Sequence, residues 1–261
     1  MIFTEVYDKL EKLAPLKYAL ERDNTGFQVG RSDKVIKKVL VATDATFDVV
    51  EQGISGKADL ILTHHPLIYD PLSKIINDDI IGRRVLDLIR NDINYMSMHT
   101  NFDVMVMADL AADKLGIKEK QIFYPTYYEG DELKEGIGRY GIVDGRKTVN
   151  EYAEKVKSEF NLDSVQVYGE RDRVVNTIAV SPGSSSDLLK YAISTGVELL
   201  ITGDIKYNMA LEALAHGISL IDAGHYGTEK IFVPFMKEFF EREMSEIEVF
   251  VANECNPFYV V

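Results

Sequence analysis

Two adjacent histidines, His64 and His65, follow a run of apolar residues in the stretch LILTHHPLIYD. Such a run is typical of a buried strand, and ligands collect at the carboxyl ends of strands in open α/β sheets. Successive side chains on a strand point to opposite faces, so two neighbouring imidazoles reach one point only where the backbone turns. Pro66 favours that turn. For this pair taken alone, two loop histidines with one at the surface is the alternative interpretation.

Two further histidines, His99 and His225, also follow apolar runs, and a carboxylate comes four residues after each, at Asp103 and Glu229. Residues i and i+4 lie on one face of a helix, so each imidazole and its carboxylate can approach a common point. Four of the five histidines therefore follow predicted strands. The fifth, His216, is expected in the last turn of a helix, before the glycine that ends it.

Neutral imidazoles and carboxylates are suitable ligands for zinc, iron or manganese, whereas the single cysteine, Cys255, is too far from these loops to offer a thiolate. Because one catalytic ion commonly keeps three protein ligands, five or more clustered donors predict two ions roughly 3.5–4 Å apart. Glu229 has a longer reach than Asp103 and is the expected bridge. Such ions generate hydroxide from water, which is hydrolase chemistry. A closed structural site that only joins two halves is the alternative.

The composition limits the classes of partner. The 261-residue chain has a formal net charge of −13, which argues against nucleic-acid binding by phosphate neutralisation, although small anions can still bind locally. No apolar run approaches the roughly 20 residues that span a bilayer. The N-terminal segment has charges where a signal peptide needs an apolar block, and the lone cysteine rules out an internal disulfide. We therefore expect a cytoplasmic protein.

Short apolar runs alternate with amphipathic stretches along the chain. Continuous hydrophobicity is typical of parallel strands that are covered on both faces, so the fold class is α/β. The expected strands are VLVA (39–42), LILT (60–63), INYMSM (93–98), TIAV (177–180), LLIT (199–202) and ISLI (218–221). In the helical stretch DDIIGRRVLDLIRND, the residues Ile81, Val85, Leu88 and Ile89 are expected to share one apolar face.

An internal repeat appears when residues 39–63 are laid over residues 178–202, at a constant offset of 139 that matches Asp59 to Glu198. Each copy has the pattern strand, helix, strand. The similarity resumes where INYMSMHTNFD aligns with LIDAGHYGTE, so that both His-x-x-x-acid pairs coincide at an offset of 126. We interpret the chain as two related α/β halves from a duplication. A chance match between similar strand-helix-strand units is the alternative.

Residues 121–147 carry Gly, Pro and acidic residues, as a domain boundary should. We predict a first α/β domain over residues 1–125, completed by the C-terminal segment 230–261, and a second over residues 126–229. A helix, NEYAEKVKSEF, is expected before the second repeat. After Glu229 we expect a helix, IFVPFMKEFFERE, and a strand, IEVFVA, that returns to the first domain.

Several motifs together resemble the dinuclear-metal proteins known as GTP cyclohydrolase I type 2 homologues, or Nif-three-like proteins. They run through the whole chain: DNTGFQVG (23–30), ILTHHPLI, MHTNFD, TGDIKYN (202–208), DAGHYGTE (222–229) and NPFYV. The resemblance implies two related α/β domains with two metal ions in the cleft between them, and ring-shaped homohexamers. The implied metal ligands are His64, His65, Asp103, His225 and Glu229. His99 is then implied to orient Asp103 or a water.

One position departs from the family pattern. Asn208 stands where many relatives have histidine, and an amide cannot act as an imidazole base. Asp204, the counterpart of His65 in the repeat, is a candidate general base or hydrogen-bond acceptor, with a helix N-cap as the alternative. SPGSSSD at 181–187 ends a strand and opens a helix. Ordinary Ser capping and phosphate binding at the helix start are both open there.

The expected function is that of a two-metal hydrolase-type protein, with Asp204 and His99 as candidate catalytic residues. The resemblance implies a small-molecule substrate such as GTP or another nucleotide, whose imidazole ring is opened by metal-activated water. Lys206, Arg83 and Arg84 are candidate sources of positive charge for such an anion. The alternative is a non-catalytic protein that stores or delivers metal, or a regulatory scaffold.

Overall fold

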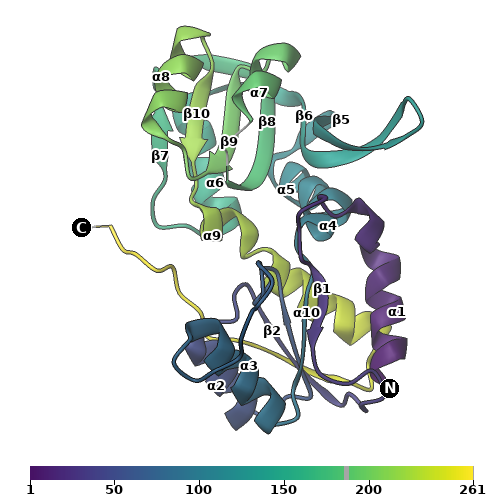
Figure 1. The fold of residues 1–261 in the computed structure, drawn as a ribbon. Coiled ribbons are helices and arrows are strands. Elements are labelled where there is room, and N and C mark those ends of the chain that lie inside the picture. Colours follow the sequence, from purple (N-terminus) through teal and green to yellow (C-terminus); the bar gives the residue numbers. More distant parts are fainter. Residues whose placement is uncertain (185–187, 261) are drawn as a thin grey trace. The chain divides into compact units, whose positions relative to one another are not determined.

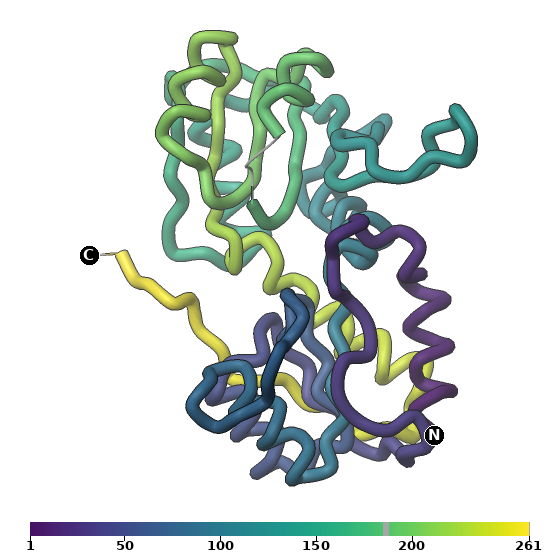
Figure 2. Tube along the Cα trace, in the orientation of Figure 1, coloured from purple at the N-terminus to yellow at the C-terminus, as the bar shows by residue number. Residues whose placement is uncertain are grey.

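The computed structural model describes residues 1–184 and 188–260, and backbone contacts divide the chain into two compact units. The first unit is Met1–Phe102 with Lys230–Cys255, and the second is Asp103–Glu229 with Asn256–Val261. Figure 2 shows the yellow C-terminal part of the chain running among the purple and blue segments of the first unit. The second unit thus begins earlier than the division after residue 125, and the division into domains stays a prediction.

The first unit contains a five-stranded sheet in the order β1-β4-β3-β2-β11. Only β1 is antiparallel to its neighbour. The strands are β1 (Gly26–Val29), β2 (Lys38–Ala42), β3 (Leu60–Thr63), β4 (Asn94–Ser97) and β11 (Glu248–Val251). The helices are α1 (Phe3–Leu13), η1 (Leu16–Tyr18), α2 (Phe47–Ser55), α3 (Ile80–Arg90), α4 (Thr100–Phe102) and α10 (Phe232–Glu243). In Figure 1, α2 and α3 cover one face of the sheet and α1 and α10 the other.

The local sequence accounts for these elements. Strands β3 and β4 are buried along their whole length, as their two-sided apolar pattern predicts. Thr46 caps α2 by accepting a hydrogen bond from Val49 N–H, which satisfies one of the helix's open donors. On the predicted apolar face of α3, Val85 and Leu88 are buried, whereas Ile89 is 56% exposed and lines a surface hollow together with them.

The second unit contains a six-stranded mixed sheet in the order β5-β6-β8-β9-β10-β7. The strands are β5 (Ile117–Glu129), β6 (Glu132–Thr148), β7 (Gln166–Tyr168), β8 (Val174–Ser184), β9 (Leu199–Gly203) and β10 (Ser219–Asp222). The helices are the π-helical turn η2 (Asp103–Met107), α5 (Ala108–Leu115), α6 (Val149–Phe160), α7 (Leu189–Thr195), α8 (Tyr207–Ala215) and α9 (His225–Glu229). Residues 121–147, which composition favours as a boundary, instead form the long β5–β6 hairpin (Figure 1). The antiparallel pairing of the two strands, from Ile117 with Val143 to Glu129 with Glu132, overrides the local Gly and Pro signals.

The α/β class is confirmed by this architecture. Each unit also repeats the same local bonds at the offset of 139 residues. Strands β2 and β8 pair with the next strand of their repeat in the same register, Val39 with Leu60 and Ile178 with Leu199. The carboxylates of Asp59 and Glu198 each accept hydrogen bonds from two consecutive N–H groups, those of residues 37–38 and 176–177. These matches support the predicted duplication, which stays a prediction.

Within the part of the chain that the structure describes, no helix combines the length and the apolar composition that crossing a membrane requires.

Candidate metal centre

Three imidazoles gather at the carboxyl edge of the first unit's sheet. His64 and His65 follow β3, and His99 follows β4. Their ring centroids are 4.9 to 5.4 Å apart, and one nitrogen of each lies within 4.8 Å of the others. The backbone therefore turns after Thr63, and the two adjacent rings point to the same place. His64 is completely buried, whereas the side chains of His65 and His99 are 23% and 19% exposed.

The imidazoles of the first unit are each held through Nδ1 by an oxygen that can only accept. The acceptors are Met98 O for His64 (2.8 Å), Asp44 Oδ1 for His65 (2.9 Å) and Asp23 Oδ1 for His99 (2.9 Å). Each Nδ1 must therefore carry a proton, and in the neutral imidazole the lone pair that can bind a metal is then on Nε2. Histidines that ligate metals are oriented in this way. The three residues thus fit a divalent ion by tautomer as well as by type.

Asp23 is a nearly buried carboxylate that supports His99. Its side chain is 3% exposed and also accepts hydrogen bonds from the backbone N–H (3.0 Å) and the hydroxyl of Thr100. Burial by itself raises the pKa of Asp23, but the bonds from His99 and Thr100 outweigh it, so the pKa lies below its ordinary value. Asp23 is therefore charged at neutral pH and holds the His99 ring in place.

The carbonyl group of His65 is held by two buried hydroxyl groups. Thr63 Oγ1 donates to the carbonyl oxygen of His65 at 2.6 Å, and the Tyr95 hydroxyl donates to the same oxygen at 2.8 Å. Tyr95 is completely buried, and burial raises the pKa of its hydroxyl, so it stays a donor at all physiological pH values. These bonds fix the turn that makes His64 and His65 point together.

The second unit brings an imidazole and two carboxylates together. His225 and Glu229 begin and end α9, so the i, i+4 spacing places His225 Nε2 3.1 Å from Glu229 Oε2. Two atoms bound to one ion at about 2.0–2.2 Å are separated by about 3 Å, so this spacing suits two ligands of the same ion. An oxygen of Asp103, in the π-helical turn, lies within 4.8 Å of one of Glu229. Such turns are frequent at functional sites.

Asp204 accepts the Nδ1 proton of His225 at 2.8 Å. Its role as a helix N-cap was wrong, because α8 has Lys206 at the N-cap position. The backbone of Asp204 is left-handed, with φ +52°, a conformation that non-glycine residues adopt rarely and often at functional sites. The side chain is thereby turned to His225 rather than to the helix.

Sequence reasoning missed three carboxylates that support the histidines, Asp23, Asp44 and Asp222. Asp222, at the end of β10, accepts from Ile205 N–H (2.8 Å) and Gly224 N–H (2.9 Å), and so ties together the loops that carry Asp204 and His225. Asp44 accepts the Nδ1 proton of His65, as Asp204 does for His225. The only sequence signal for Asp44 and Asp222 was a carboxylate at or just after the end of an apolar strand.

Gly183 provides the space that the Glu229 carboxylate occupies. A Cβ at this position would lie 2.3 Å from Glu229 Oε1 and 3.7 Å from His225 Nε2. Its N–H donates to Thr228 Oγ1 at 2.9 Å, which joins the end of β8 to α9. The expectations for SPGSSSD, Ser capping or phosphate binding, fall largely on residues 185–187, which lie outside the described residues.

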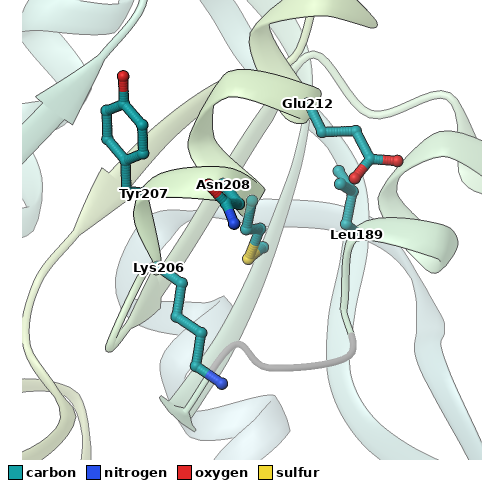
Figure 3. A pocket seen from close by; sticks show the side chains of 6 residues that line it. Leu189, Lys206, Tyr207, Asn208 and Glu212 are labelled. Atoms are coloured by element: carbon teal, nitrogen blue, oxygen red, sulfur yellow. The ribbon is translucent and has the colours of Figure 1, made fainter.

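A hollow of about 370 Å³ lies at the start of α8, two residues after Asp204. It is lined by Leu189, Lys206, Tyr207, Asn208, Met209 and Glu212. Figure 3 shows Lys206 and Tyr207 directed to opposite sides, with Asn208 between them. The hollow offers one cation, one carboxylate and an amide.

The remaining predicted residues have local roles. His216 ends α8 before Gly217, as predicted. Arg83 and Arg84 lie over the ring of Phe47, at 5.1 and 5.2 Å from its centroid. The two arginines belong to the first unit, and neither of them lines the hollow at α8.

The molecule is thus an α/β protein whose histidines, aspartate and glutamate form groups that could hold a metal ion. The chain belongs to the Duf34/NIF3 (NGG1p interacting factor 3) family, whose model matches residues 1–257. Among curated relatives, the GTP cyclohydrolase 1 type 2 homolog of Clostridium acetobutylicum is 33% identical over 223 residues, covering 84% of this chain and 82% of the relative. The homolog of Clostridium perfringens is 32% identical over 262 residues and covers 99% of both chains. The resemblance predicted from the motifs is confirmed.

Solved structures share the fold. A Bacillus cereus protein related to NIF3 has a TM-score of 0.88 at 23% identity, with 99% of each chain covered. Reduced HcgD from Methanocaldococcus jannaschii has a TM-score of 0.85 at 28% identity, covering 97% of this chain and 98% of the other.

Proposed function

We propose that the protein is a dinuclear metal-dependent hydrolase-type protein, in which two divalent ions of zinc, iron or manganese are held by His64, His65, Asp103, His225 and Glu229. The observation that carries the proposal is the anchoring of His64, His65 and His225 through Nδ1, which prepares each Nε2 as a donor atom. When bound, the ions supply hydroxide from water at neutral pH.

The two proposed catalytic residues act beside the ligands. Asp204 keeps His225 in the tautomer that binds a metal by accepting its Nδ1 proton. His99, whose own Nδ1 proton is held by Asp23, presents Nε2 toward the rings of His64 and His65. We assign His99 the task of holding the reacting water or its proton at Nε2.

The proposed substrate is a small nucleotide-like molecule, with GTP as the first candidate. The curated relatives are named as homologs of a GTP cyclohydrolase, which supports this choice. In the second unit, the hollow at α8 offers Lys206 to an anionic group and the Glu212 carboxylate to N–H donors of a base. Asn208 lines the same hollow as an amide, so no imidazole base acts from that position.

Turnover by defined metal forms tests the proposal. Protein loaded with manganese, iron or zinc is expected to hydrolyse GTP or another member of a nucleotide panel. His65→Ala and Glu229→Ala are expected to lower kcat at least 100-fold, because each removes a ligand. His216→Ala is the matched control, since His216 only ends α8, and it should keep full activity.

A different outcome would favour the second class of function. Tight binding of metal without turnover of any panel member would support a metal-storing, metal-delivering or regulatory scaffold. The nearly complete burial of His64 and Glu229 is the feature that suits such retention. Less than one equivalent of metal after careful reconstitution would contradict both functions.

The family resemblance also supports a homohexamer. A cytoplasmic location, without nucleic-acid or membrane partners, is proposed from the net charge of −13, the single cysteine and the lack of a long apolar run. Sedimentation equilibrium of the metal-loaded protein tests the assembly, and a monomer at micromolar concentration would contradict it.

A further inference from the structure

The carboxylate of Glu254 spans two consecutive backbone N–H groups at the end of β2. Its Oε2 accepts from Thr43 N–H at 2.7 Å and its Oε1 from Asp44 N–H at 3.1 Å. The partners are 211 and 210 residues apart in sequence. Because both carboxylate oxygens are used, the bond fixes the orientation of the loop as well as its position.

The C-terminal segment brings Glu254 to this loop by regular pairing. Strand β11 runs parallel to β2 with Val251 opposite Val41, and Ala252 N–H continues the ladder to Val41 O at 2.9 Å. Asn253 then exchanges two hydrogen bonds with the side chain of Gln52 in α2, at 2.7 and 3.2 Å. Glu254 is therefore positioned before it binds, which limits the entropy that the contact costs.

The two residues that Glu254 holds are the same two that hold His65. Asp44 Oδ1 accepts the Nδ1 proton of the imidazole at 2.9 Å, and Thr43 O accepts from His65 N–H at 3.0 Å. The Asp44 side chain is 45% exposed, so burial does little to fix it. Its orientation depends on the backbone that carries it, and that backbone is held by Glu254.

We propose that Glu254 is a positioning residue of the metal centre, which sets the metal affinity of His65 by fixing the loop that carries Asp44. The inference rests on the proposed metal-binding function. The C-terminal segment of the first unit then helps to position the metal ligands, in addition to completing the sheet. Removing an outer partner of a metal-binding histidine typically weakens metal binding about 10- to 100-fold.

The first test is Glu254→Gln in the full chain, titrated with Co²⁺ and Zn²⁺. The amide keeps the size of the side chain, but its NH₂ group faces one of the two N–H donors, so the loop loses half of its support. We expect Co²⁺ to bind about 10-fold more weakly. Glu248→Gln is the matched control, because Glu248 begins β11, the strand that leads to Glu254, and pairs with Lys38 at 2.7 Å. It should leave the affinity unchanged.

A double variant separates positioning from general destabilisation. If Glu254 acts through Asp44, the variant Asp44→Asn/Glu254→Gln should bind metal no more weakly than Asp44→Asn alone. If the fold-losses of metal affinity in the two single variants multiply in the double variant, the two residues act independently, and the proposal is overturned. Should Glu254→Gln fail to fold, Gln52→Ala releases the same segment more mildly and is expected to lower the affinity two- to threefold.

The metal-free protein gives a readout that does not depend on the proposed function. Long-range ¹H–¹⁵N spectra of the imidazoles should show His65 protonated at Nδ1 in the wild type and mixed between tautomers in Glu254→Gln. An unchanged His65 tautomer in Glu254→Gln would overturn the positioning role, whether or not the wild type binds metal. Failure of the wild type to bind metal, with the tautomer shift present, would instead count against the proposed function alone.

Discussion

His64, His65, His99 and His225 each donate the Nδ1 proton to an oxygen that cannot donate in return. In water an imidazole exchanges tautomers readily, so a single residue type does not define a metal ligand. The acceptors select the tautomer with its lone pair on Nε2 and fix the plane of each ring. At this scale the site is defined by pairs, a histidine and its acceptor, rather than by histidines alone.

Gly183→Ala is predicted to weaken metal binding at least 10-fold, because the new methyl group would lie 2.3 Å from Glu229 Oε1 and displace that carboxylate. The positive φ of +79° adds about 1–2 kcal/mol of backbone strain. Gly196→Ala is the control, since Gly196 has a similar φ of +69° and no heavy atom within 4 Å of the added carbon. Both variants should lose stability in urea unfolding, and only Gly183→Ala should lose metal affinity in calorimetry. Equal affinities in the two variants would contradict the prediction.

At the scale of elements, a buried arginine joins α5 to the β5–β6 hairpin. Arg139 on β6 has an 8% exposed side chain, and its Nη2 contacts Asp109 (3.0 Å) and Glu135 (3.2 Å). Its Nη1 donates to the carbonyl oxygens of Gly136 and Gly138. A buried guanidinium is tolerated only when its donors are satisfied, so these bonds fix the hairpin onto the helix.

The pH dependence of stability is predicted from Asp109. Burial raises the pKa of its carboxyl, but the bond from Lys120 and the charge of Arg139 outweigh it, and the net pKa lies below the ordinary value. A lowered folded-state pKa gives stability that is present above the unfolded-state pKa of about 3.9 and is lost as the pH falls through the folded-state value. Asp109→Asn should therefore cost about 1 kcal/mol at pH 7, after allowance for solvent screening, and should show a weaker loss of stability below pH 4.

Urea unfolding at pH 7 and in the acid range measures this effect. Asp113→Asn is the control, because Asp113 is 67% exposed and its carboxylate binds the same Lys120. It is expected to change the free energy of unfolding by less than about 0.5 kcal/mol. A larger effect for Asp113→Asn than for Asp109→Asn would show that the buried arginine is not the source of the pH dependence.

For the whole molecule, metal binding and folding are linked. The donors come from segments that are far apart in the chain, between residues 64 and 229, and an unfolded chain does not hold them together. Metal that binds only the folded state stabilises it, by about 2.7 kcal/mol at a concentration 100 times the Kd.

The wild type is therefore predicted to bind two equivalents of metal and to unfold roughly 5–10 °C higher when loaded than after chelation. Glu229→Gln, which removes the proposed bridging carboxylate, should lose most of that shift while its metal-free Tm changes little. Scanning calorimetry with parallel metal analysis provides the measurement. A shift of equal size in the wild type and Glu229→Gln would place the stabilising metal elsewhere.

Local sequence patterns predicted many of the strands and part of the candidate site. The apolar runs at 39–42, 60–63 and 199–202 form strands, because continuous hydrophobicity in short segments is a local property. The spacing of His225 and Glu229 predicted their approach, since helix geometry alone places residues i and i+4 together. The sequence by itself therefore determined the α/β class, the strand ends that carry the histidines and the family.

The acceptors that hold the histidines come from distant parts of the chain and became known from the packed structure. Asp23 reaches His99 across 76 residues of sequence, and Glu254 reaches Thr43 across 211. The β5–β6 hairpin forms where composition favoured a boundary, because the pairing of the two strands and the packing of β6 against β8 override the local Gly and Pro signals. Hydrogen bonds between distant segments leave no periodic signal in the chain, and so they become visible only when the packed sheets bring those segments side by side.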